Sequence, residues 1–227
     1  MELPAQSFWL GHASQSAVQS HPGILYGEKS VVPNPSRNSA TRYKTALVLR
    51  DGSTSHLRPI VREDEAKMLD LFHHLSPHTI YLRFHGALTH MSRDQVARFC
   101  TVDYDDTYAL VATLGEGVEE KIIAVGRYYR LPKRDAAEIA LVVEDAYQGE
   151  GIGTHLLEQL ASIAREKGIR LFEADMLAEN QQMLNVLKDT NFQTNVELEQ
   201  GVYRVSLNLI PTPIAQARPI EQEPNLS

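Results

Sequence analysis

An apolar strand, a glycine-rich turn and an amphipathic helix follow one another between residues 138 and 167, and this succession constrains the fold more than any other feature. Three glycines, Gly149, Gly151 and Gly153, stand where the strand gives way to the helix. Glycine lets a backbone adopt positive φ and approach a ligand closely, and the first N–H groups of a helix bind phosphate. The turn is therefore expected to hold a pyrophosphate; the alternative is a plain connection between strand and helix.

Two common nucleotide-binding loops do not fit this turn. No Lys-Ser or Lys-Thr pair follows the glycines, so the turn is not the P-loop of a nucleotide hydrolase. The sequence GEGIGT also lacks the third glycine of a dinucleotide-binding turn at its required spacing. Nucleotide hydrolysis and hydride transfer therefore both lose support.

The rest of the chain alternates between the periods of strands and helices. Strands are expected at 45–50, 55–60, 108–114, 121–129, 138–143, 171–177, 193–198 and 203–209. Helices are expected at 64–74, in a shorter segment that ends at 83, and at 92–100, 151–167 and 181–188. Ser92 is expected to cap the helix that it opens, and Gly168 to end the helix after the glycine-rich turn. The three consecutive strands between 108 and 143 predict an antiparallel meander.

Composition separates a central domain from two polar ends. Residues 1–45 are rich in Ser, Pro and Gly and show no sustained period, so a mobile N-terminal extension is expected there. Residues 46–210 carry the periodic elements and are expected to form one domain. Residues 211–227 form a second polar, Pro-containing tail.

Charge and composition exclude several classes of protein. The chain has 227 residues with 22 Lys and Arg against 29 Asp and Glu, and a net charge of −7 argues against sequence-independent binding of nucleic acid. The longest apolar runs have five residues, whereas a membrane-spanning helix needs about 20. The N-terminus lacks the basic segment of a secretory signal, so a cytoplasmic protein is expected. A single cysteine, Cys100, allows no internal disulfide.

The turn and its surroundings resemble the GNAT superfamily of N-acyltransferases. Gln148-Gly149-Glu150-Gly151-Ile152-Gly153 is similar to the (Arg/Gln)-x-x-Gly-x-(Gly/Ala) motif of that family, and the strand EIALVV precedes it at the usual distance. Asn180 in MLAENQQML matches an asparagine that is frequent after the fifth strand. The resemblance covers about residues 46–210. It implies the α+β GNAT fold, with a mixed, mostly antiparallel central sheet flanked by helices and a splayed strand pair that binds acyl-CoA.

The resemblance also implies the cosubstrate and the residues that bind it. Acetyl-CoA is the expected cosubstrate, and no metal is expected. In the family, one strand of the splayed pair bonds to the pantetheine arm and the turn binds the pyrophosphate. Carried over to this sequence, the expected acyl-CoA-binding residues are Leu141, Val142, Val143, Gln148, Gly149, Glu150, Gly151, Ile152, Gly153, Thr154 and Asn180.

A narrower resemblance concerns the acceptor. The segments LRPIVREDE, LSPHTIYLRFHG, VDYDDTYALVA and AAEIALVVEDAYQGEGIGTHLLE are similar to the acyltransferase domain of bacterial protein lysine acetyltransferases. This implies an N-acetyltransferase whose acceptor is a protein lysine. Two alternatives remain open: a small-molecule amine acetyltransferase, and a catalytically silent acyl-CoA-binding regulatory module. The C-terminal edge strands are compatible with a homodimer.

The reaction needs a general base, because a lysine amine with a pKa of about 10.4 is protonated at neutral pH. The resemblance places Glu138 in this role, and the alternative is a surface glutamate at a strand end. Glu144 is expected to be a solvated charge. The backbone N–H of Val142 is expected to stabilise the oxyanion of the transition state.

Two residues depart from the family pattern. Leu187 stands where many GNAT enzymes carry a tyrosine that protonates the departing thiolate, so no tyrosine acid is expected there. Glu150 lies inside the phosphate-binding turn, and its charge is expected to face solvent or to weaken the binding of coenzyme A.

The region from residue 73 to 85 has further candidate residues. Histidines suggest a metal site, but Pro77 interrupts the pair at 74 and 78, so no metal is expected; the histidines are His73, His74, His78 and His85. Tyr81, Arg83 and Phe84 are expected either to shape the acceptor entrance or to pack the short helices onto the sheet.

Overall fold

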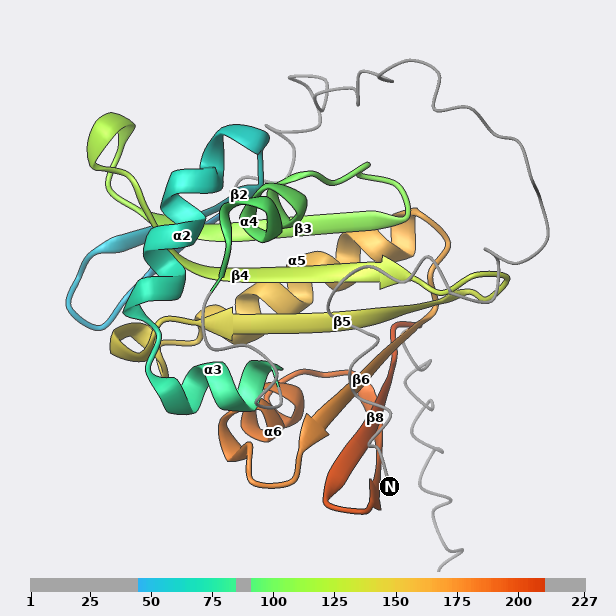
Figure 1. Ribbon diagram of the computed structural model, residues 1–227. Helices are drawn as coiled ribbons and strands as arrows, with labels where there is room; N and C mark the ends of the chain where they lie inside the picture. Colours follow the sequence, from blue (N-terminus) through green and yellow to red (C-terminus); the bar gives the residue numbers. More distant parts are fainter. Residues whose placement is uncertain (1–44, 85–90, 211–227) are drawn as a thin grey trace, which may run out of the picture.

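The computed structural model describes residues 45–84 and 91–210 (Figure 1). The predicted C-terminal tail, His85 and all but the last residue of the predicted N-terminal extension lie outside the described residues. Among the helices of the described part, none is long and apolar enough to cross a lipid bilayer.

A single eight-stranded sheet forms the centre of the fold, in the order β1-β2-β3-β4-β5-β6-β8-β7. Every neighbouring pair is antiparallel except β5 and β6, which confirms the predicted mixed, mostly antiparallel α+β architecture and its meander. The strands are β1 (Thr45–Val48), β2 (Thr54–Pro59), β3 (Thr107–Leu114), β4 (Lys121–Arg130), β5 (Ala136–Val143), β6 (Leu171–Leu177), β7 (Gln193–Glu199) and β8 (Val202–Asn208).

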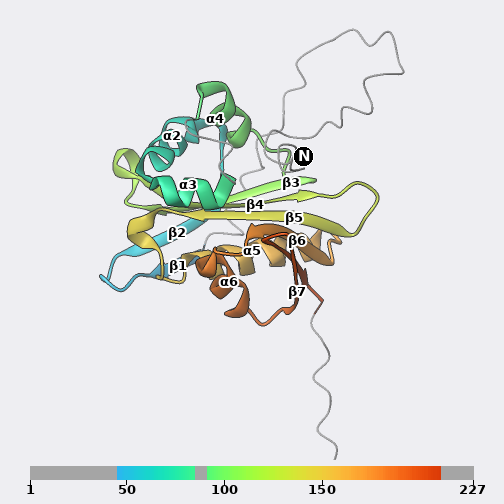
Figure 2. The ribbon, with the colours of Figure 1, turned by 60° about the horizontal axis from the view of Figure 1, so that its bottom comes forward.

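Helices cover both faces of this sheet, as Figure 2 shows. One face carries α2 (Glu65–His74), α3 (Pro77–Phe84) and α4 (Arg93–Cys100), and the other carries α5 (Ile152–Glu166) and α6 (Gln181–Lys188). Within residues 45–84 and 91–210, three short 3-10 helices join strands to helices or strands, namely η3 (Arg62–Asp64), η4 (Gly117–Glu119) and η5 (Asp145–Tyr147).

Two of these helices show the predicted end signals. Ser92 caps α4, because its hydroxyl accepts a hydrogen bond from Gln95 N and the Gln95 side chain accepts one from Ser92 N. Gly168 follows the end of α5 with φ +79°, a conformation that only glycine adopts without strain.

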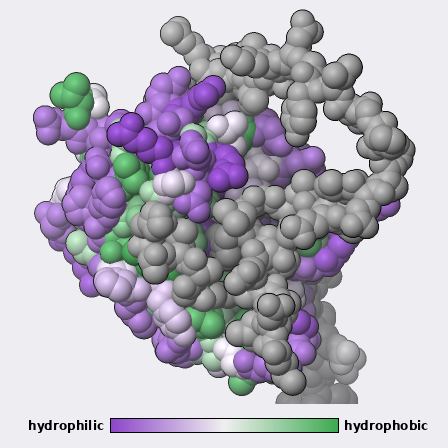
Figure 3. Space-filling model, in the orientation of Figure 1, coloured by the Kyte–Doolittle hydropathy of each residue, from purple (hydrophilic) through white to green (hydrophobic). Residues whose placement is uncertain are grey.

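The apolar core is divided by the sheet into two clusters. Strands β3 and β4 are buried along almost their whole length, because helices cover them on both sides. Leu156, Leu160 and Phe172 belong to the cluster on the α5 side, and Leu71 and Phe72 to the cluster under α2 and α4. The outer surface over α2 and α4 is largely hydrophilic, as expected for amphipathic helices (Figure 3).

Candidate active site

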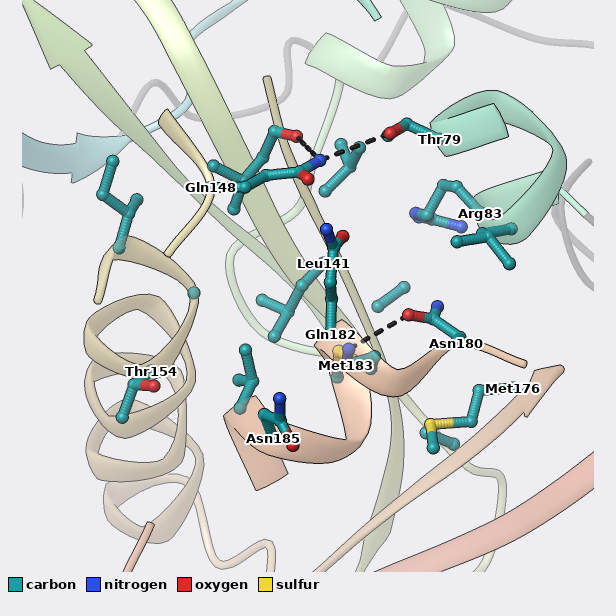
Figure 4. A pocket seen from close by; sticks show the side chains of 18 of the residues that line it. Thr79, Arg83, Leu141, Gln148, Thr154, Met176, Asn180, Gln182, Met183 and Asn185 are labelled. Carbon is teal, nitrogen blue, oxygen red and sulfur yellow. Dashed lines mark hydrogen bonds between the residues drawn. The ribbon is translucent and has the colours of Figure 1, made fainter. Parts of the chain in front are cut away.

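The parallel strands β5 and β6 pair over only three residues and then separate. Their register joins residues 136–138 to 171–173 and ends at Glu138 and Glu173, while β5 continues to Val143. A cavity of about 390 Å³ opens where they part. Its walls come from β5, the glycine-rich turn, the start of α5, β6, α6 and α3 (Figure 4). The sheet therefore contains the splayed pair that the sequence predicted, with Glu138 at the branch point.

Hydrogen bonding along β5 determines which backbone groups face this cavity. Glu144 N donates to Ile123 O on the β4 side at 2.8 Å, and Ala136 O accepts from Leu131 N on that same side. Because backbone groups alternate along a strand, residues 138, 140 and 142 also point their N–H groups toward β4. The expectation that the N–H of Val142 serves the oxyanion is therefore wrong. The N–H groups on the cavity side belong to residues 139, 141 and 143.

The side chains of β5 divide between the two faces of the sheet. Leu141 and Val143 pack against the α5-side core, and Val142 packs against the cluster under α2 and α4. All three residues line the cavity. A Cβ on Gly126, the partner of Leu141 in β4, would lie 2.5 Å from Leu141 Cδ2, so glycine is needed there for this packing.

The glycine-rich turn leaves the start of α5 open. Gly149 and Gly151 have φ values of +78° and +81°, and a Cβ on Gly153 would approach Val186 Cγ2 to 3.1 Å. Gly151 is the N-cap of α5, no side chain caps this helix, and its first internal hydrogen bond runs from His155 N to Gly151 O. Residues 152–154 consequently present N–H groups that the helix itself does not use.

Polar contacts join this turn to α3. Gln148 Nε2 donates to Val143 O at 3.1 Å and to Thr79 Oγ1 at 3.3 Å (Figure 4). The Asp145 carboxylate accepts hydrogen bonds from Ser76 N, Ser76 Oγ and Thr79 Oγ1. Burial alone would raise the pKa of Asp145, but these hydrogen bonds lower it overall. Gln148 therefore fixes the turn against the helix that covers the cavity.

The charge of Glu150 is compensated by the β1–β2 hairpin. Glu150 Oε2 accepts a hydrogen bond from Arg50 N at 2.9 Å, and the Arg50 guanidinium donates to Gly149 O at 2.9 Å. The Glu150 side chain is only 18% exposed. The Glu150 charge therefore does not face solvent, which was one of the two expectations; Arg50, from a distant part of the chain, holds the carboxylate instead.

Glu138 is half-buried beside the cavity. Its pKa is raised to about 7: burial is the largest cause, Arg83 acts in the opposite direction, and the nearby Asp175 and Glu173 carboxylates add to the rise. A carboxyl group with this pKa exists in both protonation states near neutral pH, as a general base requires. Glu144 does not have the expected solvated position, because it is 8% exposed at the end of β5.

The remaining predicted residues are divided between the cavity wall and the core. Asn180 lines the cavity and caps α6, since its side-chain oxygen accepts from Met183 N at 3.0 Å. Arg83 lines the cavity, Phe84 is buried in the core, and Tyr81 is exposed. A hydrogen bond to the Glu179 carboxylate raises the pKa of Tyr81.

Leu187 is 1% exposed in the core, so an apolar side chain occupies the place of the family's tyrosine. Across residues 45–84 and 91–210, no three His, Cys, Asp or Glu side chains gather closely enough to hold a metal ion.

Arg127 on β4 is a buried charge near the site that the sequence motifs did not predict. It is 3% exposed, donates to Tyr129 Oη at 2.7 Å and Phe99 O at 2.6 Å, and stacks on the Phe99 ring at 4.6 Å. Its cross-strand neighbour on β5 is Ala140, two residues from Glu138. A lone arginine inside the apolar strand IIAVGRYY is the signal that could have found it, because charges are rarely buried without a reason.

A splayed strand pair that opens beside a glycine-rich turn and an uncapped helix start is the architecture of an acyltransferase. The chain belongs to the GNAT family: the sequence profile described as "Acetyltransferase (GNAT) family" matches residues 70–192. The protein is therefore an acyltransferase of this family.

Individual relatives agree with this assignment. An acetyltransferase of Pseudomonas aeruginosa is 30% identical over 131 residues, which are 57% of this chain and 70% of that protein. The acetyltransferase Pat of Mycolicibacterium smegmatis is 32% identical over 140 residues, 61% of this chain, but the match spans only 41% of that longer protein. The crystal structure of the GNAT domain of S. lividans PAT superposes with a TM-score of 0.67 at 34% identity and covers 74% of this chain and 97% of that domain.

Proposed function

We propose that the protein transfers an acetyl group from acetyl-CoA to a lysine side chain of a protein, with Glu138 as the general base. The position of Glu138 carries this proposal: it is a half-buried carboxyl group, with a pKa raised to about 7, at the branch point of the splayed strands. The family's use of acetyl-CoA and the similarity to the acetyltransferase Pat support the donor and the reaction.

The cavity fits coenzyme A as a substrate. The N–H groups of Ile152, Gly153 and Thr154 have no partner within α5 and suit the pyrophosphate, which the positive end of the helix dipole also attracts. The N–H groups of Leu141 and Val143 and the carbonyl of Leu141 face the cavity and suit the amide groups of pantetheine, whereas the carbonyl of Val143 already accepts from Gln148 Nε2. The wall is completed by Val142, Gln148, Gly149, Gly151 and Asn180. Glu150, held by Arg50, supports the turn from behind.

In the proposed reaction, ionised Glu138 takes a proton from the lysine ammonium, and the neutral nitrogen attacks the thioester carbonyl. The N–H of Leu141, on the cavity side of β5, is placed to stabilise the oxyanion. The attack forms the C–N bond and a tetrahedral oxyanion, whose collapse breaks the C–S bond. The second proton lost by the nitrogen passes through water to the departing thiolate, so that coenzyme A leaves as a thiol; Leu187 has no group that could relay it.

Carboxylates beside Glu138 favour a cationic acceptor. In the parallel register Glu173 lies next to Glu138, and Asp175 follows two residues along β6 on the same face. Glu173 is ion-paired with Arg134, and Asp175 is exposed. A negative surface of this kind attracts a lysine ammonium, and it would also suit a small polyamine. The identity of the acceptor is therefore what the experiment must decide.

The test follows the release of thiol from acetyl-CoA by the purified protein, with a lysine-rich protein mixture, with spermidine and with free lysine. Thiol release that requires the protein mixture, together with mass-spectrometric detection of acetyl-lysine, is the expected result. Thiol release with only spermidine or free lysine present would mean that the acceptor is a small amine and not a protein. Tight binding of acetyl-CoA without release in any of the three arms would identify a regulatory module instead.

The rate is expected to depend on pH through Glu138. Only the ionised carboxylate accepts a proton, so kcat/KM should fall tenfold per pH unit below the pKa of about 7 and level off above it, until another group titrates. Initial rates measured across this range with saturating acetyl-CoA and with protein acceptor well below its KM would give the profile. A rate that stays constant down to the usual glutamate pKa of 4.5 would mean that Glu138 is not the titrating group.

A further inference from the structure

A second, smaller cavity adjoins the main one on the α2–α4 face of β5. Two residues, Arg83 and Val142, line both cavities. The rest of its wall is apolar or aromatic apart from Arg127, and among the described residues that line it there is no carboxylate. We call this space the side pocket. It therefore combines two guanidinium groups with an otherwise apolar wall.

Arg127 is held rigidly in the side pocket. Its hydrogen bonds to Tyr129 Oη and Phe99 O and its stacking on Phe99 fix the plane of the guanidinium. Burial and the nearby charge of Arg127 lower the pKa of Arg83 to about 9, Tyr129 and the Glu138 carboxylate act in the opposite direction, and Arg83 is still cationic at neutral pH. Two positive charges close together in an apolar environment favour a bound anion, and a planar guanidinium suits a carboxylate.

The position of Arg127 in the sheet relates the side pocket to the acyl group. Arg127 is the cross-strand neighbour of Ala140, which lies on β5 between Glu138 and Val142. Side chains of such pairs lie about 5 Å apart at Cβ, and alanine leaves the space above the strand open. If the thioester carbonyl accepts a hydrogen bond from the Leu141 N–H, the acyl chain is directed over Ala140 toward Arg127.

We propose that the side pocket binds the distal carboxylate of a short dicarboxylic acyl group, so that the enzyme accepts malonyl- or succinyl-CoA as well as acetyl-CoA. This inference rests on the proposed function, because it needs the acyl chain to lie along β5. The side pocket has a volume of about 30 Å³. One water needs about 10–15 Å³ by the same measure, so a three-atom carboxylate fits and a bulky acceptor side chain does not.

The chemical step is the same as with acetyl-CoA. The amine nitrogen forms the C–N bond to the thioester carbonyl, the C–S bond breaks, and coenzyme A leaves as a thiol. The distal carboxylate takes no part in the bond changes and remains ionised. The product is an amide that carries a terminal carboxylate, so the modification changes the acceptor charge from +1 to −1.

The test compares acetyl-, malonyl- and succinyl-CoA with the wild type and three variants. Arg127→Met removes the guanidinium, Arg127→Lys keeps the charge, and Arg98→Met changes an exposed arginine on α4 as the matched control. The measured quantities are kcat/KM with each thioester and the Kd of each thioester by calorimetry. Thermal unfolding shows whether each variant is folded.

We expect the wild type to use malonyl- or succinyl-CoA with a kcat/KM within about tenfold of that for acetyl-CoA. Arg127→Met should lower the ratio of dicarboxylic to acetyl kcat/KM by about 50-fold, as expected for the loss of a charged hydrogen bond. Arg127→Lys should retain only part of the ratio, because it keeps the charge and loses the planar guanidinium, and Arg98→Met should retain all of it.

Three results would overturn the inference. One is a wild type that turns over acetyl-CoA but neither dicarboxylic thioester. Another is an Arg127→Met variant that is folded and keeps the ratio. The third is a change in kcat/KM on replacing Arg127 that is the same for all thioesters and depends on the charge of the acceptor. If no thioester is turned over, the proposed function fails, and the Kd ratio between succinyl- and acetyl-CoA still decides whether the side pocket binds a carboxylate.

Discussion

Replacement of Glu138 by glutamine is expected to lower the rate of acyl transfer at mildly alkaline pH by about 10²- to 10⁴-fold. Glutamine has nearly the same shape but does not accept a proton from the ammonium. The affinity for acetyl-CoA should stay nearly unchanged, because the turn and the cavity-facing backbone of β5 provide the proposed cosubstrate contacts. Steady-state kinetics and calorimetry on the same protein preparation would separate the two quantities.

Two controls belong to this experiment. Glu173→Gln changes the β6 residue paired with Glu138, and its effect on the rate should be far smaller than that of Glu138→Gln, because Glu173 is ion-paired with Arg134 and takes no proton from the acceptor. Protein stability is the other control, since burial raises the pKa of Glu138 from 4.5 to about 7. The ionised group therefore destabilises the fold progressively between these two pH values, by about 3 kcal/mol once fully ionised above them.

Above neutral pH, the unfolding temperature of Glu138→Gln should consequently be equal to or higher than that of the wild type. If the variant transfers acyl groups slowly and its unfolding temperature is at least that of the wild type, the loss of rate comes from the missing base and not from unfolding. A folded variant that keeps the wild-type rate would show that the amine attacks without help from Glu138. Weaker binding of acetyl-CoA that matches the loss of rate would instead assign Glu138 a role in shaping the cavity.

The parts of the fold predicted from the sequence are those governed by local patterns. The glycine-rich turn, the helix that follows it and its end at Gly168 depend on residues close in sequence, so their positions agree with the structure within a few residues. The boundaries of β6 and α6 agree fully, because each is marked by a clear change of period. The splayed pair followed from the family resemblance and not from any local signal.

The site details that were wrong depend on contacts between distant segments. Glu144 is buried because β5 continues beside Ile123 of β4, a pairing with no local mark in the sequence. The backbone direction of Val142 depends on the β4–β5 register, and a shift of one residue would reverse it. Arg50 reaches Glu150 across 100 positions of chain, so the compensation of that charge could not be read from the motif.

Replacement of Arg58 by methionine is expected to destabilise the protein by about 3–5 kcal/mol, because it leaves a buried carboxylate without its ion-pair partner. Arg58 donates two hydrogen bonds to Asp64, at 2.7 and 2.8 Å, and two to Glu120, both at 3.0 Å. Asp64 is 2% exposed and also accepts from Val61 N at 2.9 Å. Lys67 of α2 completes the network through Glu120. The network therefore fastens η3 and α2 to the sheet, over the face on which Glu138 lies.

Urea unfolding of matched variants would measure this effect. Arg62→Met is the control, since Arg62 is 80% exposed and 4.0 Å from Glu65, and it should cost less than about 1 kcal/mol. Adding Asp64→Asn to Arg58→Met removes the stranded charge, so the double variant should be more stable than Arg58→Met alone. Equal stability of Arg58→Met and the wild type would contradict a role for the network in holding α2.

The pH dependence of the same variants gives an independent measurement. Hydrogen bonds from Arg58 lower the pKa of Glu120 to about 2 from the usual 4.5. The resulting stabilisation is complete above the upper value and is lost as the pH falls through the lower one. In Arg58→Met the pKa of Glu120 returns toward 4.5, so stability should fall less steeply with acid in the variant than in the wild type. The two curves should therefore converge at low pH, and parallel curves would mean that Arg58 acts by packing and not by charge.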